Sequence, residues 1–134
     1  METTTHFVSD YEYEAVNESG NKVHIDMYPR EEKKNHSPTE LLLSALSACA
    51  SVDLVQMLKK RKKTVNALEV RAVGNRREEI PKSFTDIILY FKLTSPDATI
   101  EEFEKLAHLA ATKYCSVAGT LNSEIKHKYE VIRP

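Results

Sequence analysis

The sequence predicts a single α+β domain in which the elements follow the order strand, strand, helix, strand, strand, helix, helix, strand. Three observations predict this class. The chain has 134 residues, the usual size of one compact domain. A long apolar helix has a clear start signal near residue 37, and segments of strand-forming residues stand on both sides of it. No linker, repeat or low-complexity tract interrupts the chain, so residues 1–134 are treated as one domain.

Two strands are expected before the long helix. Residues Phe7–Glu14 suit the first, and Asn17–Asn21 has the composition of a turn. The second strand is expected over Lys22–Tyr28, where apolar and polar residues alternate. The two strands would form a hairpin with one buried face. A charged segment without periodicity, Pro29–Asn35, is expected to be a loop.

The long helix has a capping box at its start. Ser37 is placed as the N-cap, Pro38 occupies the first helical position, and Glu40 follows the cap by three residues. The helix is expected to run to about Lys62, where the basic run 59–63 faces the negative end of the helix dipole. No aromatic residues interleave this run, so it is interpreted as a solvated helix end and not as a nucleic-acid or membrane surface.

The same helix is apolar on most of its circumference. Its segment Leu41–Leu58 includes Asp53, Gln56 and several serines and alanines, which favours a helix buried in protein over a membrane span. The remaining elements are too few to cover such a helix within one chain. We therefore predict an obligate homodimer, in which two of these helices are enclosed by shared sheets.

The second half of the chain contains the other predicted elements. A second helix begins at a cap provided by Asp97 or Thr99, and its apolar stripe runs to Thr112. A short helical segment follows Cys115 and ends near Asn122. The three strands predicted here lie at Ala67–Arg76, Ser83–Leu93 and Ile125–Ile132.

Composition and missing motifs exclude several classes of function. Hydrophobic residues make up 41% and charged residues 29% of the chain, and the net charge of −1 gives no electrostatic reason to expect a nucleic-acid partner. The N-terminus lacks the basic and apolar regions of a signal peptide, so a cytoplasmic location is expected. The five histidines have no metal-ligand spacing, and no CxxC, GxSxG, GxGxxG or P-loop pattern is present. Neither a metal nor an organic cofactor is expected.

The two cysteines, Cys49 and Cys115, are the candidate reactive groups. In a reducing compartment they do not suit a structural disulfide. Asp53 lies four residues after Cys49, about 40° around the helix, where it could orient a partner or bind a cation. A carboxylate alone raises the pKa of a neighbouring thiol, so activation of Cys49 would need a nearby positive charge. The alternative is that Cys49 is only a small apolar residue in a helix interface.

Cys115 precedes a new helical turn, whose backbone N–H groups would favour a thiolate there. Lys113 and His108 are close in sequence, and His108 would share a face with Cys115 if the second helix continued unbroken. The alternative is that His108 is a residue of the helix surface. If folding brings the two sulfurs together, they can act as a redox pair.

At this point the segments SPTELLLSALSACASVDLV and KYCSVAGTL resemble the OsmC/Ohr family, named for osmotically inducible protein C and organic hydroperoxide resistance protein. The resemblance in element order covers essentially the whole chain. It implies an intertwined homodimer with long central helices covered by antiparallel sheets, and two active sites at the subunit interface. It also implies thiol-dependent reduction of hydroperoxides, preferentially organic ones, as a defence against oxidative stress.

The resemblance further implies distinct roles for the two cysteines. Cys49 would be the peroxidatic thiolate that becomes a sulfenic acid, and Cys115 would resolve it as an intramolecular disulfide. A dithiol reductant would restore both thiols, and no cofactor is needed.

The sequence departs from the peroxidase branch of this family around the expected activating groups. In that branch a glutamate directly follows the proline that opens the long helix and pairs with an arginine, whereas here Thr39 follows Pro38. Glu40 is one residue late and is assigned to the capping box. Arg30 of the partner subunit is the candidate activating cation. Ser116 stands where the peroxidase branch usually has proline, so the chain is placed in a divergent branch.

These departures keep a second hypothesis open. In this alternative the chain is a non-enzymatic module of the same fold, whose apolar pocket at the dimer interface binds a small lipophilic ligand.

Overall fold

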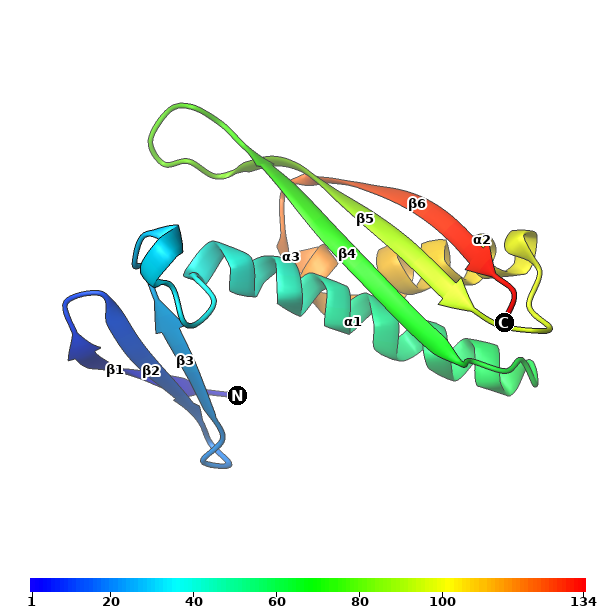
Figure 1. The fold of residues 1–134 in the computed structure, drawn as a ribbon, viewed down its shortest axis with the longest axis horizontal. Coiled ribbons are helices and arrows are strands. Elements are labelled where there is room, and N and C mark those ends of the chain that lie inside the picture. The colour runs from blue at the N-terminus through cyan, green and yellow to red at the C-terminus, as the bar shows by residue number, and fades with distance from the viewer. The chain divides into compact units, whose positions relative to one another are not determined.

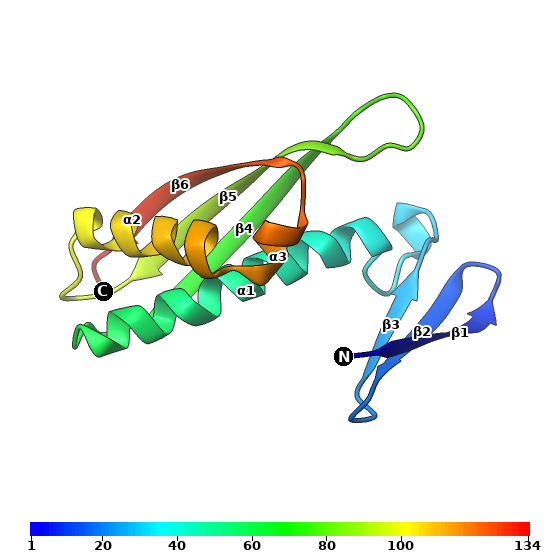
Figure 2. The ribbon, with the colours of Figure 1, turned by 180° about the vertical axis from the view of Figure 1, so that it is seen from behind.

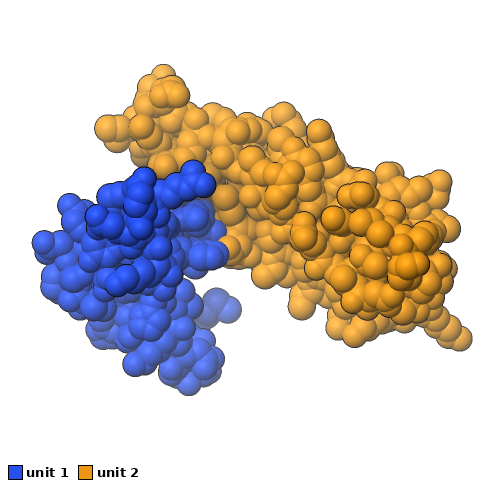
Figure 3. Space-filling model, viewed as in Figure 1, with its two compact units in different colours: residues 1–42 blue, residues 43–134 orange.

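The computed structural model describes residues 1–134, with six strands and three α-helices (Figure 1). The chain divides into two compact units, unit 1 (Met1–Leu42) and unit 2 (Leu43–Pro134), which are coloured separately in Figure 3. Each unit contains one three-stranded sheet. The predicted α+β class is confirmed. That residues 1–134 fold as one domain stays a prediction.

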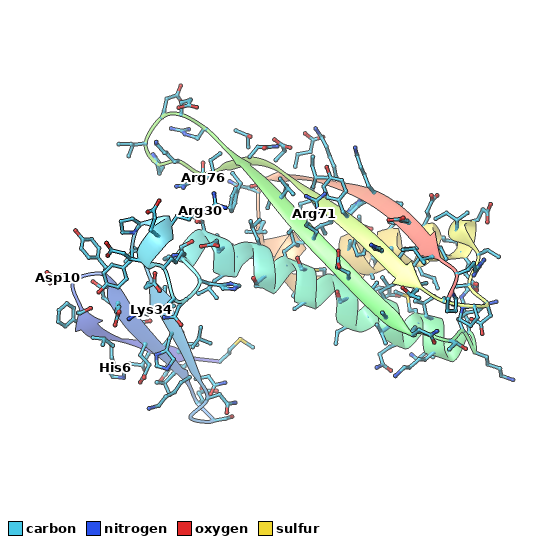
Figure 4. All side chains as sticks on the ribbon, in the orientation of Figure 1. His6, Asp10, Arg30, Lys34, Arg71 and Arg76 are labelled. Carbon is cyan, nitrogen blue, oxygen red and sulfur yellow. The ribbon has the colours of Figure 1, made fainter.

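Unit 1 is built on an antiparallel sheet of three neighbouring strands, β1 (Thr3–Ser9), β2 (Glu12–Asn17) and β3 (Lys22–Asp26). The prediction of one strand over Phe7–Glu14 is wrong, because the chain reverses at residues 10–11 (Figure 4 labels Asp10). This turn contains no glycine or proline, and strand-forming residues flank it on both sides, so the sequence pattern does not show the break.

The turn predicted over residues 17–21 is confirmed. The side-chain oxygen of Asn17 accepts hydrogen bonds from the backbone N–H groups of Ser19, at 3.0 Å, and Asn21, at 2.9 Å. Gly20 has a φ of +85°, a conformation that costs other residues free energy. The turn is therefore specified by its own residues.

Asp26 organises the segment that follows β3. Its side chain is fully buried and accepts hydrogen bonds from the backbone N–H groups of Lys34, at 3.0 Å, and Asn35, at 2.6 Å. The Lys33 ammonium lies 3.3 Å from the same carboxylate. Burial raises the pKa of Asp26, but these donors and the Tyr28 amide outweigh it and bring the pKa down to about 2. The loop predicted over residues 29–35 contains the short 3₁₀ turn η1 (Arg30–Glu32) and closes around this carboxylate.

Helix α1 (Pro38–Lys60) begins with the predicted capping box. The backbone N–H of Ser37 donates to the Glu40 carboxylate at 3.1 Å, and the backbone N–H of Glu40 donates to Ser37 Oγ at 3.3 Å. The helix ends two residues before the predicted Lys62. Lys62 adopts a φ of +59°, and the next N–H bonds back to the carbonyl of Leu58 at 3.0 Å, which closes the helix.

Unit 2 has a sheet of β4 (Ala67–Arg76), β5 (Phe84–Thr94) and β6 (Glu124–Ile132). The β4–β5 pair is antiparallel, but β5 and β6 run parallel, so the expectation of purely antiparallel sheets is wrong for this unit. The chain reaches β6 through helices instead of a hairpin, and a connection of this kind allows a parallel pairing. On the outer face Arg71 lies over the Tyr90 ring, 4.2 Å from its centroid (Figure 4).

The core of unit 2 lies between its sheet and two helices. Within this unit α1 and α2 (Ile100–Leu109) cover the same face of the sheet (Figures 1 and 2). Helix α1 contributes one buried row at intervals of four residues, as expected for one side of a helix. The residues buried on β5 and α1 are Ile87, Leu89, Phe91, Leu93, Leu46, Ala50, Leu54 and Leu58.

The single chain covers only one side of α1, and burial of the whole helix, which the sequence predicts only for a dimer, stays a prediction. Only 22% of its most apolar window is buried, and Val52 is 62% exposed. Its length and composition would let it cross a membrane, but the core helices of soluble proteins meet the same criteria. One side of α1 packs in unit 2, and its other apolar side remains accessible.

The second predicted helix is interrupted before its expected end. Thr99, and not Asp97, caps α2, because Thr99 Oγ1 accepts from the N–H of Glu102 at 3.2 Å. The Asp97 carboxylate instead accepts from the N–H of Thr64 at 2.8 Å. After α2 the chain forms a π-helical turn, η2 (Ala110–Tyr114), and then the short helix α3 (Ser116–Thr120). Cys115 stands at the junction between these two segments.

Candidate active site

The two cysteines come together from distant parts of the sequence within unit 2. Cys49 lies half-buried on α1, and Cys115 is buried, with 4% of its surface exposed, at the start of α3. Figures 1 and 2 both show α3 beside α1. The Cys115 side chain hydrogen-bonds with Cys49, and both sulfurs are free thiols. Packing of α3 against α1 therefore forms a dithiol site.

Backbone amides hold the Cys49 sulfur. The N–H of Val117 is the strongest influence and lowers the Cys49 pKa, and the Cys115 thiol and the N–H of Ser116 lower it further. Burial and the charge of Asp53 act in the opposite direction, but the net pKa of Cys49 is lowered. The arrangement favours a thiolate at Cys49.

The Cys115 sulfur has the opposite character. Burial raises the pKa of Cys115, and the neighbouring Cys49 raises it further. The N–H of Ala118 donates to Cys115 Sγ at 3.4 Å, so Cys115 is the N-cap of α3, as its position in the sequence predicted. The N–H groups of Ala118 and Val117 do lower the Cys115 pKa, in the expected direction, but burial outweighs them, so the expected thiolate at Cys115 is not favoured. The amides of Ser116 and Val117 also act on Cys49, where their effect prevails.

The amides of Ser116 and Val117 are the functional groups that sequence reasoning missed. A positive side chain was expected to activate Cys49, but none of the main influences on its pKa is a basic side chain. Backbone N–H groups exist at every non-proline residue, so residue types do not reveal them. The one sign of such a donor in the sequence was Ser116, because serine keeps the backbone N–H that a proline at this position would lack.

The structure places the other candidate residues in two groups. Asp53, in unit 2, is close enough to Cys49 for its charge to raise the thiol pKa. Arg30 lies in the η1 turn of unit 1 and is exposed (Figure 4). Thr39 and Glu40 lie in the first turn of α1, also within unit 1. Thr39 Oγ1 is 3.4 Å from Ser37 Oγ, and Glu40 is engaged in the capping box.

His108 does not join the cysteine pair. The π-helical turn η2 breaks the helix, and the exposed His108 ring instead lies 5.6 Å, centroid to centroid, from the ring of His127 on β6. The interpretation of His108 as a surface residue therefore fits the structure better. The structure contains no group of three or more His, Cys, Asp or Glu residues that could hold a metal ion.

A cavity of about 210 Å³ lies along the Cys49 face of α1 in unit 2. It begins at Asp53, one helical turn after Cys49, and continues to Lys60. Its lining combines the apolar surfaces of Met57 and Tyr114 with the polar side chains of Asp53, Gln56 and Lys60. Tyr114 directly precedes Cys115, so the cavity adjoins both segments that carry the thiols.

A family model and a relative of known sequence indicate the family of this chain. Residues 31–130 match the family model described as OsmC-like protein. The protein YhfA of Escherichia coli (strain K12) is 40% identical over 101 residues, which is 74% of this chain and 75% of YhfA.

Solved structures with low sequence identity share the fold. A hypothetical protein from Aquifex aeolicus VF5 superimposes with a TM-score of 0.86 at 24% identity, covering 99% of this chain and 96% of that one. The organic hydroperoxide resistance protein OhrB of Bacillus subtilis gives a TM-score of 0.63 at 15% identity, covering 98% and 96% of the two chains. The fold therefore extends over nearly the whole sequence.

Proposed function

Because this chain belongs to the OsmC-like protein family, we propose that it is a thiol-dependent peroxidase that reduces hydroperoxides, preferentially organic ones, through Cys49 and Cys115. The observation that carries the proposal is the asymmetry of the two thiols. Backbone amides lower the pKa of Cys49, and burial raises the pKa of Cys115. A thiolate beside a protonated thiol is the arrangement that a two-cysteine peroxidase needs.

The proposed cycle has three steps. The Cys49 thiolate attacks the terminal oxygen of the hydroperoxide, the O–O bond breaks, and the departing alkoxide is protonated to an alcohol. Cys49 becomes a sulfenic acid. The Cys115 sulfur then attacks the Cys49 sulfur, water leaves, and a disulfide forms. A dithiol reductant of the cytoplasm reduces this disulfide and becomes a disulfide itself.

The cavity that begins one helical turn after Cys49 offers some apolar surface to an organic substrate. Met57 and Tyr114 provide apolar surface for the organic group of the hydroperoxide, while its O–O bond meets Cys49 one helical turn away. Hydrogen peroxide would gain nothing from this surface. The name of the B. subtilis structural neighbour, an organic hydroperoxide resistance protein, supports the same class of substrate.

We also propose that the active form is a homodimer. The apolar side chains of Phe7 and Val23 in the unit 1 sheet, and of Val52 on α1, are exposed in the single chain. A second copy of the chain would cover these surfaces. In this dimer Arg30 of the partner subunit is the proposed basic group near Cys49. It would add to the stabilisation that the amides of Ser116 and Val117 provide.

The central test compares wild type, Cys49→Ser and Cys115→Ser with cumene hydroperoxide or hydrogen peroxide and dithiothreitol. We expect wild type to consume the organic peroxide faster and to form an intramolecular disulfide detectable by mass spectrometry. Cys49→Ser should lose turnover, and Cys115→Ser should stop at the sulfenic acid, which dimedone traps. Unchanged turnover in Cys49→Ser would exclude the proposed mechanism.

The dimer has a separate test on α1. Val52→Lys places a charge on the exposed apolar side of the helix and should shift the molecular mass measured by light scattering to that of a monomer. Glu104→Lys is the control, because Glu104 is an exposed residue of a different helix, α2. Arg30→Ala should slow peroxide reduction without dissociating the dimer. Lys34 is also an exposed basic residue of unit 1, and Lys34→Ala should leave the rate of peroxide reduction unchanged (Figure 4). A Val52→Lys variant that keeps the mass of wild type would contradict this interface.

One observation favours the second candidate function, a non-enzymatic module that binds a small lipophilic ligand. None of the main influences on the Cys49 pKa is a basic side chain. A Cys49 pKa near the ordinary thiol value of about 8.5, slow reaction with peroxide and saturable binding of a fluorescent fatty acid would support this alternative.

A further inference from the structure

We propose that Cys115 has a second role in the proposed peroxidase: its sulfur caps α3 and thereby positions the amides of Ser116 and Val117 that hold the Cys49 sulfur. This positioning role rests on the proposed function and is separable from the resolving role of the thiol. In this proposal the Cys115 side chain first orients the two amides and later attacks the Cys49 sulfenic acid.

The geometry of α3 supports this role. Cys115 leaves the π-helical turn with extended backbone angles, φ −73° and ψ 106°, so the chain changes direction at this residue. Its Sγ accepts from the N–H of Ala118 at 3.4 Å, and its carbonyl accepts from the N–H of Gly119 at 3.1 Å. A helix of five residues has few internal hydrogen bonds, so its first turn depends strongly on the cap.

The amides of the same first turn are the ones that act on Cys49. Ser116 and Val117 lie between the cap and its donor, Ala118, so the cap bond fixes the direction of both N–H groups. Hydrogen bonds from amides to an anionic acceptor are stronger than those to a neutral one. If the cap is lost, these N–H groups are free to turn away, and the Cys49 thiolate loses its main stabilisation.

Two substitutions separate capping from resolution. Serine is a strong N-cap and alanine a weak one, and neither can form a disulfide with Cys49. The test measures the rate at which iodoacetamide alkylates Cys49 as a function of pH, by mass spectrometry of the single-cysteine variants. We expect Cys115→Ser to keep the low midpoint of wild type. Cys115→Ala should raise the midpoint and reduce the alkylation rate at neutral pH by about 3- to 10-fold, the effect of losing one or two modest hydrogen bonds.

Hydrogen exchange distinguishes the cap from direct donation by the Cys115 thiol to Cys49. A lost cap exposes the Ala118 amide, so its exchange should accelerate in Cys115→Ala and stay slow in Cys115→Ser. A raised Cys49 midpoint with unchanged exchange at Ala118 would overturn the positioning role, as would equal midpoints in the two variants. The isosteric pair Cys115→Thr and Cys115→Val provides the same comparison if the alanine variant fails to fold.

The alkylation experiment needs no peroxide, so its outcome is independent of the proposed activity. A protein that does not reduce hydroperoxides can still show the difference between Ser and Ala at position 115. Conversely, if wild type reduces hydroperoxides but Cys49 is alkylated equally in Cys115→Ser and Cys115→Ala, the proposed function is retained and the positioning role is excluded.

Discussion

Different interactions stabilise the interior of each compact unit. Unit 2 has an apolar core, in which Phe91 and Phe103 are essentially inaccessible to solvent. In unit 1 the only buried side chain is that of Asp26, and Phe7 is 66% exposed. Unit 1 therefore depends on strand pairing and on a buried carboxylate with its donors. A sheet of this kind is at most marginally stable alone, which supports the proposal that a second copy covers it.

The largest expected effect tests this difference directly. Phe91→Ala should cost about 3–5 kcal/mol of unfolding free energy, because it leaves a cavity in a packed core. This cost should be the same at every protein concentration. Phe7→Ala should act mainly through the dimer, so its effect on denaturant unfolding should vary with concentration. A concentration-independent loss of several kcal/mol at Phe7 would contradict the comparison.

The second prediction concerns the buried carboxylate of unit 1. Asp26 has its pKa lowered to about 2, so the folded state favours the ionised form. Its contribution to stability is full above the unfolded pKa of about 4 and is lost as the pH falls through about 2. Acid should therefore release residues 33–35 before it opens the core of unit 2. NMR of the amides of Lys34 and Asn35 measures this release, and Asp26→Asn should abolish its dependence on pH in that range.

Local features of the fold were predictable because their signals lie close together in sequence. The capping box at Ser37 and Glu40 and the turn at Asn17 are specified within a few residues. The turn at residues 10–11 was missed, since it lacks glycine and proline. The parallel pairing of β5 with β6 depends on where the intervening helices place the chain, and no local pattern encodes it.

The candidate site also has one feature that the local sequence predicts and others that it does not. The cap at Cys115 could be predicted from its position before a short helix. The asymmetry of the two thiols could not, because it depends on burial of Cys115 and on how α3 meets α1. Arg30 lies in unit 1 and Cys49 in unit 2, and the role proposed for that arginine is assigned to the partner subunit.

A third prediction uses the two positive φ angles, one in each unit. Gly20 has a φ of +85° in the unit 1 turn, and Lys62 has a φ of +59° at the end of α1. Gly20→Ala should destabilise the protein by about 1 kcal/mol, and Lys62→Gly should stabilise it by about 0.5–1 kcal/mol. Thermal or denaturant unfolding measures both. A loss of stability in Lys62→Gly would show that backbone strain does not control position 62, and unchanged or raised stability in Gly20→Ala would show the same for position 20.

The smallest effect concerns how each unit stabilises an anion. Backbone amides support both the Asp26 carboxylate and the Cys49 thiolate, but at Cys49 the charge of Asp53 opposes them. Asp53→Asn should therefore lower the Cys49 pKa slightly, and iodoacetamide alkylation should reach its midpoint at a lower pH. Because Asp53 is partly exposed, added salt should screen its charge and move wild type toward the variant. The midpoint of the Asn variant, which depends on the amides, should hardly respond to salt. Equal salt responses in the two proteins would mean that Asp53 does not act on Cys49 through its charge.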